Sequence, residues 1–126
     1  MRYFTPSHSP KPAGHYAHGV AHGGLLFVSG QLPLDPATGK VAGTTAAEQT
    51  ERALQNIGLV LAAAGSRPDR VLKVTVFLCD FEKRGEVNAA YAKFFGAHTP
   101  ARATIPIAPL PNGMLVEIEA VAAVDE

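Results

Sequence analysis

A helix followed by a strand is predicted by residues 45–79, TAAEQTERALQNIGLVLAAAGSRPDRVLKVTVFLC. Thr45 and Glu48 have the spacing of a capping box, in which each side chain bonds the backbone N–H of the other residue, so the helix begins here. Apolar residues then recur at three- and four-residue steps up to Gly65, which ends the helix because glycine accepts a left-handed conformation. Residues 71–79 are rich in β-branched side chains and therefore predict a strand.

Further elements are predicted on both sides of this unit. The apolar run 25–28 lies between turn-forming glycines and predicts a buried strand, with which residues 15–21 could pair as a hairpin. Residues 86–95 carry an apolar stripe at helical spacing and predict a second helix. Residues 103–108 are strand-like but contain proline, which places them at a sheet edge or a bulge. Residues 114–124 predict a long final strand.

The predicted order is strand, strand, helix, strand, helix, strand, strand. It indicates an α+β sandwich in which two helices cover one face of a mixed sheet, formed by one domain over residues 1–126. On the final strand, Glu117, Glu119 and Val121 share one face. Phe77 also lies on the face away from the core, so this second face is partly apolar and could pack against another subunit.

Composition excludes several classes of protein. There are 11 basic and 11 acidic residues, and a net charge of zero argues against phosphate-backbone binding and polybasic membrane attachment. The single cysteine cannot form an intramolecular disulfide or a thiolate metal cage. The first residues lack an apolar signal core, and the longest apolar run, 57–65, is far shorter than the roughly 20 residues that span a bilayer. We expect a cytoplasmic protein with no membrane segment.

Three histidines and the cysteine are candidates for metal binding or catalysis. His15, His18 and His22 would gather on one face of a helix, but the neighbouring glycines disfavour a helix, and on a strand His15 points away from the other two. We therefore favour exposed or hydrogen-bonded strand histidines over a metal site. Cys79 has no adjacent histidine or cation to stabilise a thiolate, so we interpret it as a small apolar residue.

Arg102 and two glutamates are stronger candidates. Arg102 precedes an otherwise uncharged strand, where a guanidinium could clamp a carboxylate, although a surface arginine or a structural ion pair is the simpler interpretation. Glu117 and Glu119 could form a solvated face. Alternatively, one of them meets Arg102 across paired strands joined by the turn at 111–113, where a carboxylate could orient a water for attack.

The segments around these residues resemble a known family. TPARATI (99–105), LPNG (110–113) and VEIEA (116–120) are similar to the signature of the RidA (YjgF) family of reactive-intermediate imine and enamine deaminases. The resemblance runs from about residue 13 to residue 124. It includes FVSGQLP (27–33), DPATG (35–39), VLKVTVFL (71–78) and VNAAY (87–91).

The resemblance implies a chorismate-mutase-like fold assembled as a homotrimer, with ligand sites between subunits. Family deaminases hydrolyse 2-imino and 2-enamino acids, such as 2-iminopropionate (2-aminoacrylate), to 2-keto acids and ammonia without a cofactor. In this sequence Arg102 matches the arginine that grips the substrate carboxylate, and Glu117 matches the glutamate that holds the attacking water. Thr104 stands where many members have cysteine, and its hydroxyl could bond that water. Positions that match pocket-lining residues are Tyr16, Ser29, Gly30 and Asn88.

Two departures leave the preferred imino acid open. His15 replaces the proline of a common Gly-Pro-Tyr motif, and His18 stands where glutamine or a small polar residue is common. We expect both histidines on the rim of the cleft, where they could alter substrate choice.

Other functions use the same residues. A non-enzymatic trimeric 2-keto-acid binder or sensor would need the same arginine and cleft. A specialised deaminase of aromatic or pyrimidine degradation also stays open. Endoribonuclease activity has been attributed to parts of this family, but the neutral charge and the lack of an evident histidine acid–base pair count against it. We do not expect nucleic acid as a partner.

Overall fold

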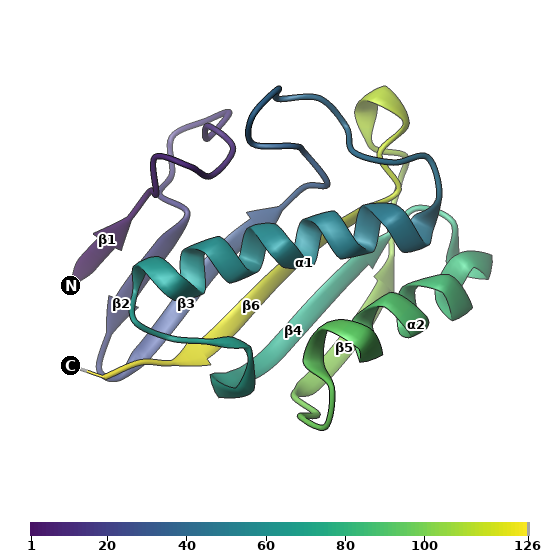
Figure 1. Cartoon of the computed structure of the whole chain (residues 1–126). Coiled ribbons are helices and arrows are strands. Elements are labelled where there is room, and N and C mark those ends of the chain that lie inside the picture. The colour runs from purple at the N-terminus through teal and green to yellow at the C-terminus, as the bar shows by residue number, and fades with distance from the viewer. Residues whose placement is uncertain (126) are drawn as a thin grey trace.

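The computed structural model describes residues 1–125 and contains one six-stranded sheet with two helices in front of it (Figure 1). The helices are α1 (Ala46–Ala63) and α2 (Arg84–Phe95). The strands are β1 (Arg2–Phe4), β2 (Gly19–His22), β3 (Leu25–Gln31), β4 (Val71–Leu78), β5 (Ala101–Pro106) and β6 (Val116–Ala123).

The strands follow the order β1-β2-β3-β6-β4-β5. Each neighbouring pair is antiparallel except β4 and β5, which are parallel, so the sheet is mixed. Both helices cover the same face (Figure 1). The predicted α+β class is therefore confirmed, and so is the edge position of β5, where proline removes a ladder donor.

One strand was not predicted, and most element boundaries differ from the sequence prediction by a few residues. β1 was not predicted, because its three residues show no periodic pattern and acquire strand structure only by pairing with β2. A 3-10 turn at Phe81–Lys83 leads directly into α2, which therefore begins two residues before position 86. β5 begins at Ala101 and ends at Pro106, because its parallel register with β4 sets its length.

The capping box predicted for α1 is present. The Glu48 N–H donates to Thr45 Oγ1 at 3.1 Å, and the Thr45 N–H donates to Glu48 Oε1 at 3.2 Å. Gly65, at φ +75°, lies just beyond the helix in the left-handed region expected of a terminating glycine.

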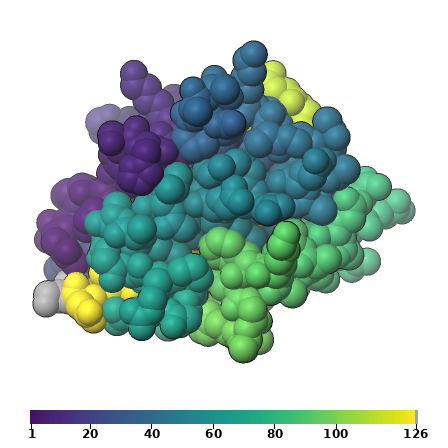
Figure 2. Space-filling view, in the orientation of Figure 1, coloured from purple at the N-terminus to yellow at the C-terminus, as the bar shows by residue number. Residues whose placement is uncertain are grey.

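The core lies between the helices and the sheet. Leu54, Ile57 and Leu61 of α1 are fully buried, as are Val76 of β4 and Ile118 of β6. Side chains of α1 and α2 close this face of the molecule (Figure 2). None of the helices in residues 1–125 has the length and apolar character needed to cross a membrane.

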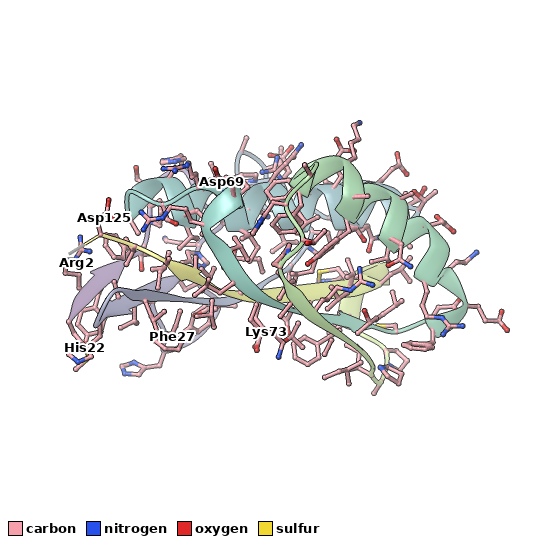
Figure 3. All side chains as sticks on the ribbon, turned by 90° about the horizontal axis from the view of Figure 1, so that it is seen from below. Arg2, His22, Phe27, Asp69, Lys73 and Asp125 are labelled. Carbon is pink, nitrogen blue, oxygen red and sulfur yellow. The ribbon has the colours of Figure 1, made fainter. Side chains whose placement is uncertain are left out.

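No helix or strand within residues 1–125 covers the other face of the sheet (Figure 3). Phe27 and Lys73 project from it, away from the helices (Figure 3). Phe27 is 50% exposed and Ile105 is 41% exposed, which is unusual for large apolar side chains on a sheet. This open face is the partly apolar second face that the strand pattern predicts.

Gln49 of α1 anchors the start of β6. It is buried, its amide nitrogen donates to the Gly113 carbonyl at 3.1 Å, and its amide oxygen accepts from the Leu115 N–H at 2.7 Å. These bonds satisfy backbone groups that no strand pairs, so they fix where β6 enters the sheet.

Asn56 makes the corresponding connection to the segment after β3. Its side-chain nitrogen donates to the carbonyls of Leu32 and Leu34 at 3.0 and 2.9 Å, and the residue is fully buried.

We expect Asn56→Ala to lower the free energy of unfolding by about 2 kcal/mol, because two buried carbonyls lose their donor. Urea unfolding measures this change. Gln55→Ala, at an exposed position of the same helix, is the control and should change stability little; equal losses in both variants would contradict the assignment.

Candidate functional site

A pocket of about 400 Å³ opens on the face of the sheet away from the helices. It is lined by Tyr16, Ser29, Gly30, Phe77, Glu117 and Glu119. Among the described residues that line it there is no lysine or arginine, so its charge comes from the two carboxyl groups.

An irregularity in β3 shapes the pocket wall. The pairing between β3 and β6 shifts register between Val28 and Gln31, which leaves Ser29 and Gly30 as a bulge. A Cβ atom at Gly30 would lie only 3.0 Å from Cδ of Glu117. Any side chain at position 30 would therefore press on the Glu117 carboxyl group and displace it, whereas glycine lets it rest against the backbone.

Glu117 is half-buried between the bulge and β4, where its cross-strand neighbour is Phe77. Burial raises the pKa of the Glu117 carboxyl above its ordinary value, and the charge of Glu119 on the same strand face raises that pKa further. Both effects disfavour the ionised form. A carboxyl group with a raised pKa in a pocket is suited to exchanging a proton with a water molecule or substrate.

Arg102 lies on β5, where it pairs with Val74 of β4. Its guanidinium carbon lies 4.7 Å from the centre of the Tyr91 ring, and this stacking on α2 places it on the helix side of the sheet. The Arg102 side chain is exposed, whereas Tyr91 is buried. An arginine held flat against an aromatic ring keeps its outer N–H groups free to bind a carboxylate.

The alternative in which a glutamate meets Arg102 across paired strands of one chain is wrong. β4 lies between β5 and β6, so Arg102 and Glu117 are on strands that do not touch. They also face opposite sides of the sheet. The segment joining β5 to β6 contains two prolines and bonds the end of β4 on both sides, with Ile107 N–H donating to Leu78 and Cys79 N–H donating to Leu115. It therefore forms a crossing loop and not a hairpin turn.

Comparison with known proteins identifies the family. Residues 6–124 match the family model described as Endoribonuclease L-PSP. A 2-iminobutanoate/2-iminopropanoate deaminase of Rattus norvegicus is 38% identical over 121 residues, which cover 96% of this chain and 88% of the relative. This chain belongs to the RidA/YjgF family. The family model is thus described as a nuclease, whereas one relative is named as a deaminase.

Solved structures of similar proteins agree with this assignment. A structure from Thermotoga maritima, described as an endoribonuclease candidate, superposes with a TM-score of 0.93 at 40% identity and covers 100% of this chain and 99% of its own. TdcF of E. coli with bound serine superposes with a TM-score of 0.92 at 31% identity, covering 99% of this chain and 100% of its own.

The site residues predicted from the RidA resemblance fall into two groups in one chain. Tyr16, Ser29, Gly30 and Glu117 come together at the pocket. Arg102 and Thr104 lie instead on the edge strand β5, and Asn88 lies on the exposed side of α2, one turn before Tyr91. Thr104 pairs with Val76, so it shares the helix-side face with Arg102.

The structure also brings to the site residues that the RidA resemblance does not place there, one of which, Glu119, the strand pattern had already made a candidate. Phe77 and Glu119 line the pocket, and alternation along their strands already placed them on the same face as Glu117. Tyr91 supports Arg102, but its place in the apolar stripe of a helix made it indistinguishable from an ordinary core residue.

The histidines and the cysteine do not form a catalytic or metal cluster. His15 and His22 are exposed, whereas His18 is buried with hydrogen bonds at both ring nitrogens. The expectation of a hydrogen-bonded histidine is confirmed for His18, but its expected place on the rim is wrong, because Gln31 and Pro10 enclose it. Cys79 is half-buried, with its thiol near the Ala108 and Met114 carbonyls. Within residues 1–125, no three His, Cys, Asp or Glu side chains are grouped to hold a metal ion.

Removing the charge of Glu119 tests the electrostatics of the RidA-family pocket. We expect Glu119→Gln to lower the pKa of Glu117, because the repulsion that disfavours its ionised form is lost. The Glu117 carboxyl should then ionise at lower pH, which a ¹³C NMR titration of the side chain measures directly. Glu82→Gln, at an exposed position by α2, should leave the titration unchanged. A Glu117 pKa that stays constant or rises in Glu119→Gln contradicts this account.

Proposed function

We propose that this chain forms a homotrimer whose sites, shared between neighbouring subunits, hydrolyse small 2-imino and 2-enamino acids such as 2-iminopropionate to a 2-keto acid and ammonia. One observation carries the proposal: a half-buried glutamate with a raised pKa lines a pocket on one face, while an exposed, stacked arginine lies on the other face of the same sheet. The similarity to the rat deaminase supports this reaction, and the serine bound to TdcF supports an amino-acid-like ligand.

The arrangement within one chain favours a shared site. A substrate carboxylate in the Glu117 pocket meets two acidic side chains and needs a cation. Arg102 of the same chain cannot supply it, because β4 separates the two strands and the side chains face opposite ways. Arg102 lies on an edge strand, however, and the open face around the pocket exposes apolar side chains that a second copy could cover.

In the proposed mechanism Arg102 of one subunit binds the substrate carboxylate through two parallel hydrogen bonds. This orients the C=N carbon toward a water molecule held by Glu117 of the neighbouring subunit. Ser29 and the backbone N–H of Gly30 line the pocket beside Glu117 and would contact the substrate, and the Tyr16 ring forms a side wall of the pocket. Thr104 lies on the same face as Arg102, so its hydroxyl would enter the site from the same subunit.

The proton balance requires only water and the carboxyl group. The water oxygen bonds to the imine carbon while Glu117 accepts a proton from this water molecule. The protonated imine nitrogen thereby becomes the amine of a carbinolamine. Glu117 then returns this proton to the amine nitrogen and takes the hydroxyl proton as the C=O bond forms and the C–N bond breaks. Ammonia leaves and accepts that last proton, so the products are the 2-keto acid and ammonium, and Glu117 is again ionised. The raised pKa of Glu117 makes it a better proton acceptor than an exposed carboxylate and lets it return the proton to the leaving nitrogen.

Nuclease and sensor functions make different demands on this site. Cleavage of RNA needs a surface that attracts phosphates, but the net charge is zero and the pocket lining within the described residues has no cation or histidine. A sensor would bind a 2-keto acid at the same place without turnover. The experiment below separates hydrolysis from binding alone.

Arg102→Ala should lower kcat/KM by about 10²-fold or more, because the carboxylate loses both its anchor and its orientation. The assay follows pyruvate release from 2-iminopropionate generated in situ, with semicarbazide trapping the surviving imine. Arg84→Ala is a matched control, because Arg84 also stacks on an aromatic ring, Phe81 at 4.4 Å, but lies outside the site. If the wild-type protein does not accelerate pyruvate release, deaminase activity on this substrate is excluded; bound 2-ketobutyrate would then indicate a sensor.

Mixing two inactive variants tests whether the site is shared. Arg102→Ala and Glu117→Gln subunits each retain the half of the site that the other lacks. Random reassembly of a 1:1 mixture should restore about one quarter of the sites, since that fraction receives Arg102 and Glu117 from intact donors. Each variant reassembled alone is the control. Activity that stays at the level of the single variants in trimers shown to be mixed would place both residues within one subunit and overturn the shared site.

A further inference from the structure

A hydrogen-bonded group centred on His18 lies directly behind the pocket wall. His18 is 3% exposed, and its Nδ1 lies 3.0 Å from the side-chain nitrogen of Gln31. Since an amide nitrogen can only donate, Nδ1 accepts and the proton is on Nε2, which donates to the Pro10 carbonyl. Gln31 also donates to the Ser29 carbonyl at 3.1 Å. The imidazole thus connects the N-terminal segment to the β3 bulge.

Two further bonds join the same segments. The Ser29 N–H donates to the His18 carbonyl at 2.8 Å, and the Ser29 hydroxyl donates to the Ala17 carbonyl at 2.7 Å. The Tyr16 ring lies edge-on to the His18 imidazole, with the ring centres 6.0 Å apart. Residues 16–18 and 29–31 therefore form one block. Its outward surface consists of Tyr16, Ser29 and Gly30, which line the pocket beside Glu117.

We propose that His18 is a positioning residue for the pocket, which holds the Ser29–Gly30 bulge and the Tyr16 ring in place against the Glu117 carboxyl group. The inference rests on the proposed function for its kinetic test and on the geometry above for its structural test. The bulge has particular need of such support, because regular pairing between β3 and β6 is interrupted between Val28 and Gln31. Gly30 has no side chain of its own to pack there.

The chemistry of the position distinguishes this role from simple filling of the core. An apolar side chain would fill the space, but it would leave the Gln31 amide and the Pro10 carbonyl without their partner. A glutamine at position 18 has a carbonyl oxygen that can accept from Gln31 and an NH2 group that can donate to Pro10, so it can make both bonds. The proposal therefore predicts that His18→Gln preserves the pocket and that His18→Leu does not.

The first experiment measures kcat and KM for pyruvate release with His18→Leu and His18→Gln. We expect His18→Leu to lower kcat by about tenfold or more with a smaller change in KM, because misplaced groups around Glu117 cost more in the transition state than in binding. His18→Gln should restore kcat to within about threefold of wild type. Gln31→Leu removes the same bond from its other end and should reproduce the loss even if His18→Leu fails to fold.

Ser66→Ala is the control for a general loss of stability. It removes another buried bond, from the Ser66 hydroxyl to the Ala123 carbonyl at 2.7 Å, which involves the last residue of β6 and none of the pocket residues. This variant should lower Tm while kcat of the folded protein stays unchanged. A positioning role predicts a different result for His18→Leu, in which kcat of the folded protein falls whatever the change in Tm.

NMR of the backbone amides of Ser29 and Gly30 provides a readout that does not depend on turnover. In His18→Leu or Gln31→Leu these resonances should shift and exchange with solvent faster, and in His18→Gln they should stay close to wild type. Unchanged amides and kcat in folded His18→Leu would overturn the proposal, as would a loss in His18→Gln equal to that in His18→Leu. If wild type hydrolyses no imino acid, the proposed function fails and the amide data alone decide the role of His18.

Discussion

The close contact between the Glu117 carboxyl group and the backbone of Gly30 is the constraint on which the rest of the site depends. The carboxyl group rests there beside the β3 bulge at Ser29 and Gly30, and a Cβ atom at position 30 would push it away. The same contact removes water from Glu117, and burial is the larger cause of its raised pKa. A local irregularity in one strand thus determines the proton affinity of a residue on its neighbour.

The position of β4 imposes the second constraint. Because β4 pairs with both β5 and β6, it separates Arg102 from Glu117 within one chain. The pocket holds two carboxyl groups and no cation among its described lining residues, and the arginine has no carboxylate within salt-bridge distance among the described residues. Each group is chemically incomplete where it stands. Assembly through the exposed apolar side chains of the open face would bring Arg102 of one subunit to the Glu117 pocket of another. The same surface would then serve both association and substrate binding.

Local sequence patterns predicted most of the helices and strands, but they did not predict which strands that are distant in the sequence pair with each other. The capping box at Thr45 and the terminating Gly65 gave the limits of α1, because those signals act within a few residues. The separation of Arg102 from Glu117 depends on which strand pairs with β5, and turn-forming residues between β5 and β6 suggested a hairpin that two prolines and the end of β4 prevent. Of the site residues that the resemblance to the RidA family indicates, those on β3, β6 and the segment before β2 lie together at the pocket, whereas those on β5 and α2 lie elsewhere in the same chain.

The raised pKa of Glu117 also has a consequence for the folded state as a whole. A carboxyl group with a higher pKa when folded than when unfolded binds protons more tightly in the native state. Its contribution to stability is therefore greatest below the unfolded pKa and is lost as the pH rises through the folded pKa, the reverse of a carboxylate in an ion pair. In its ionised form Glu117 is poorly solvated and repelled by Glu119, so this form weakens the fold that holds it. Hydrogen bonds of the buried side chains Gln49, Asn56 and His18 fix the start of β6, the segment after β3 and the β3 bulge, and this rigidity keeps an unfavourable charge in a fixed position.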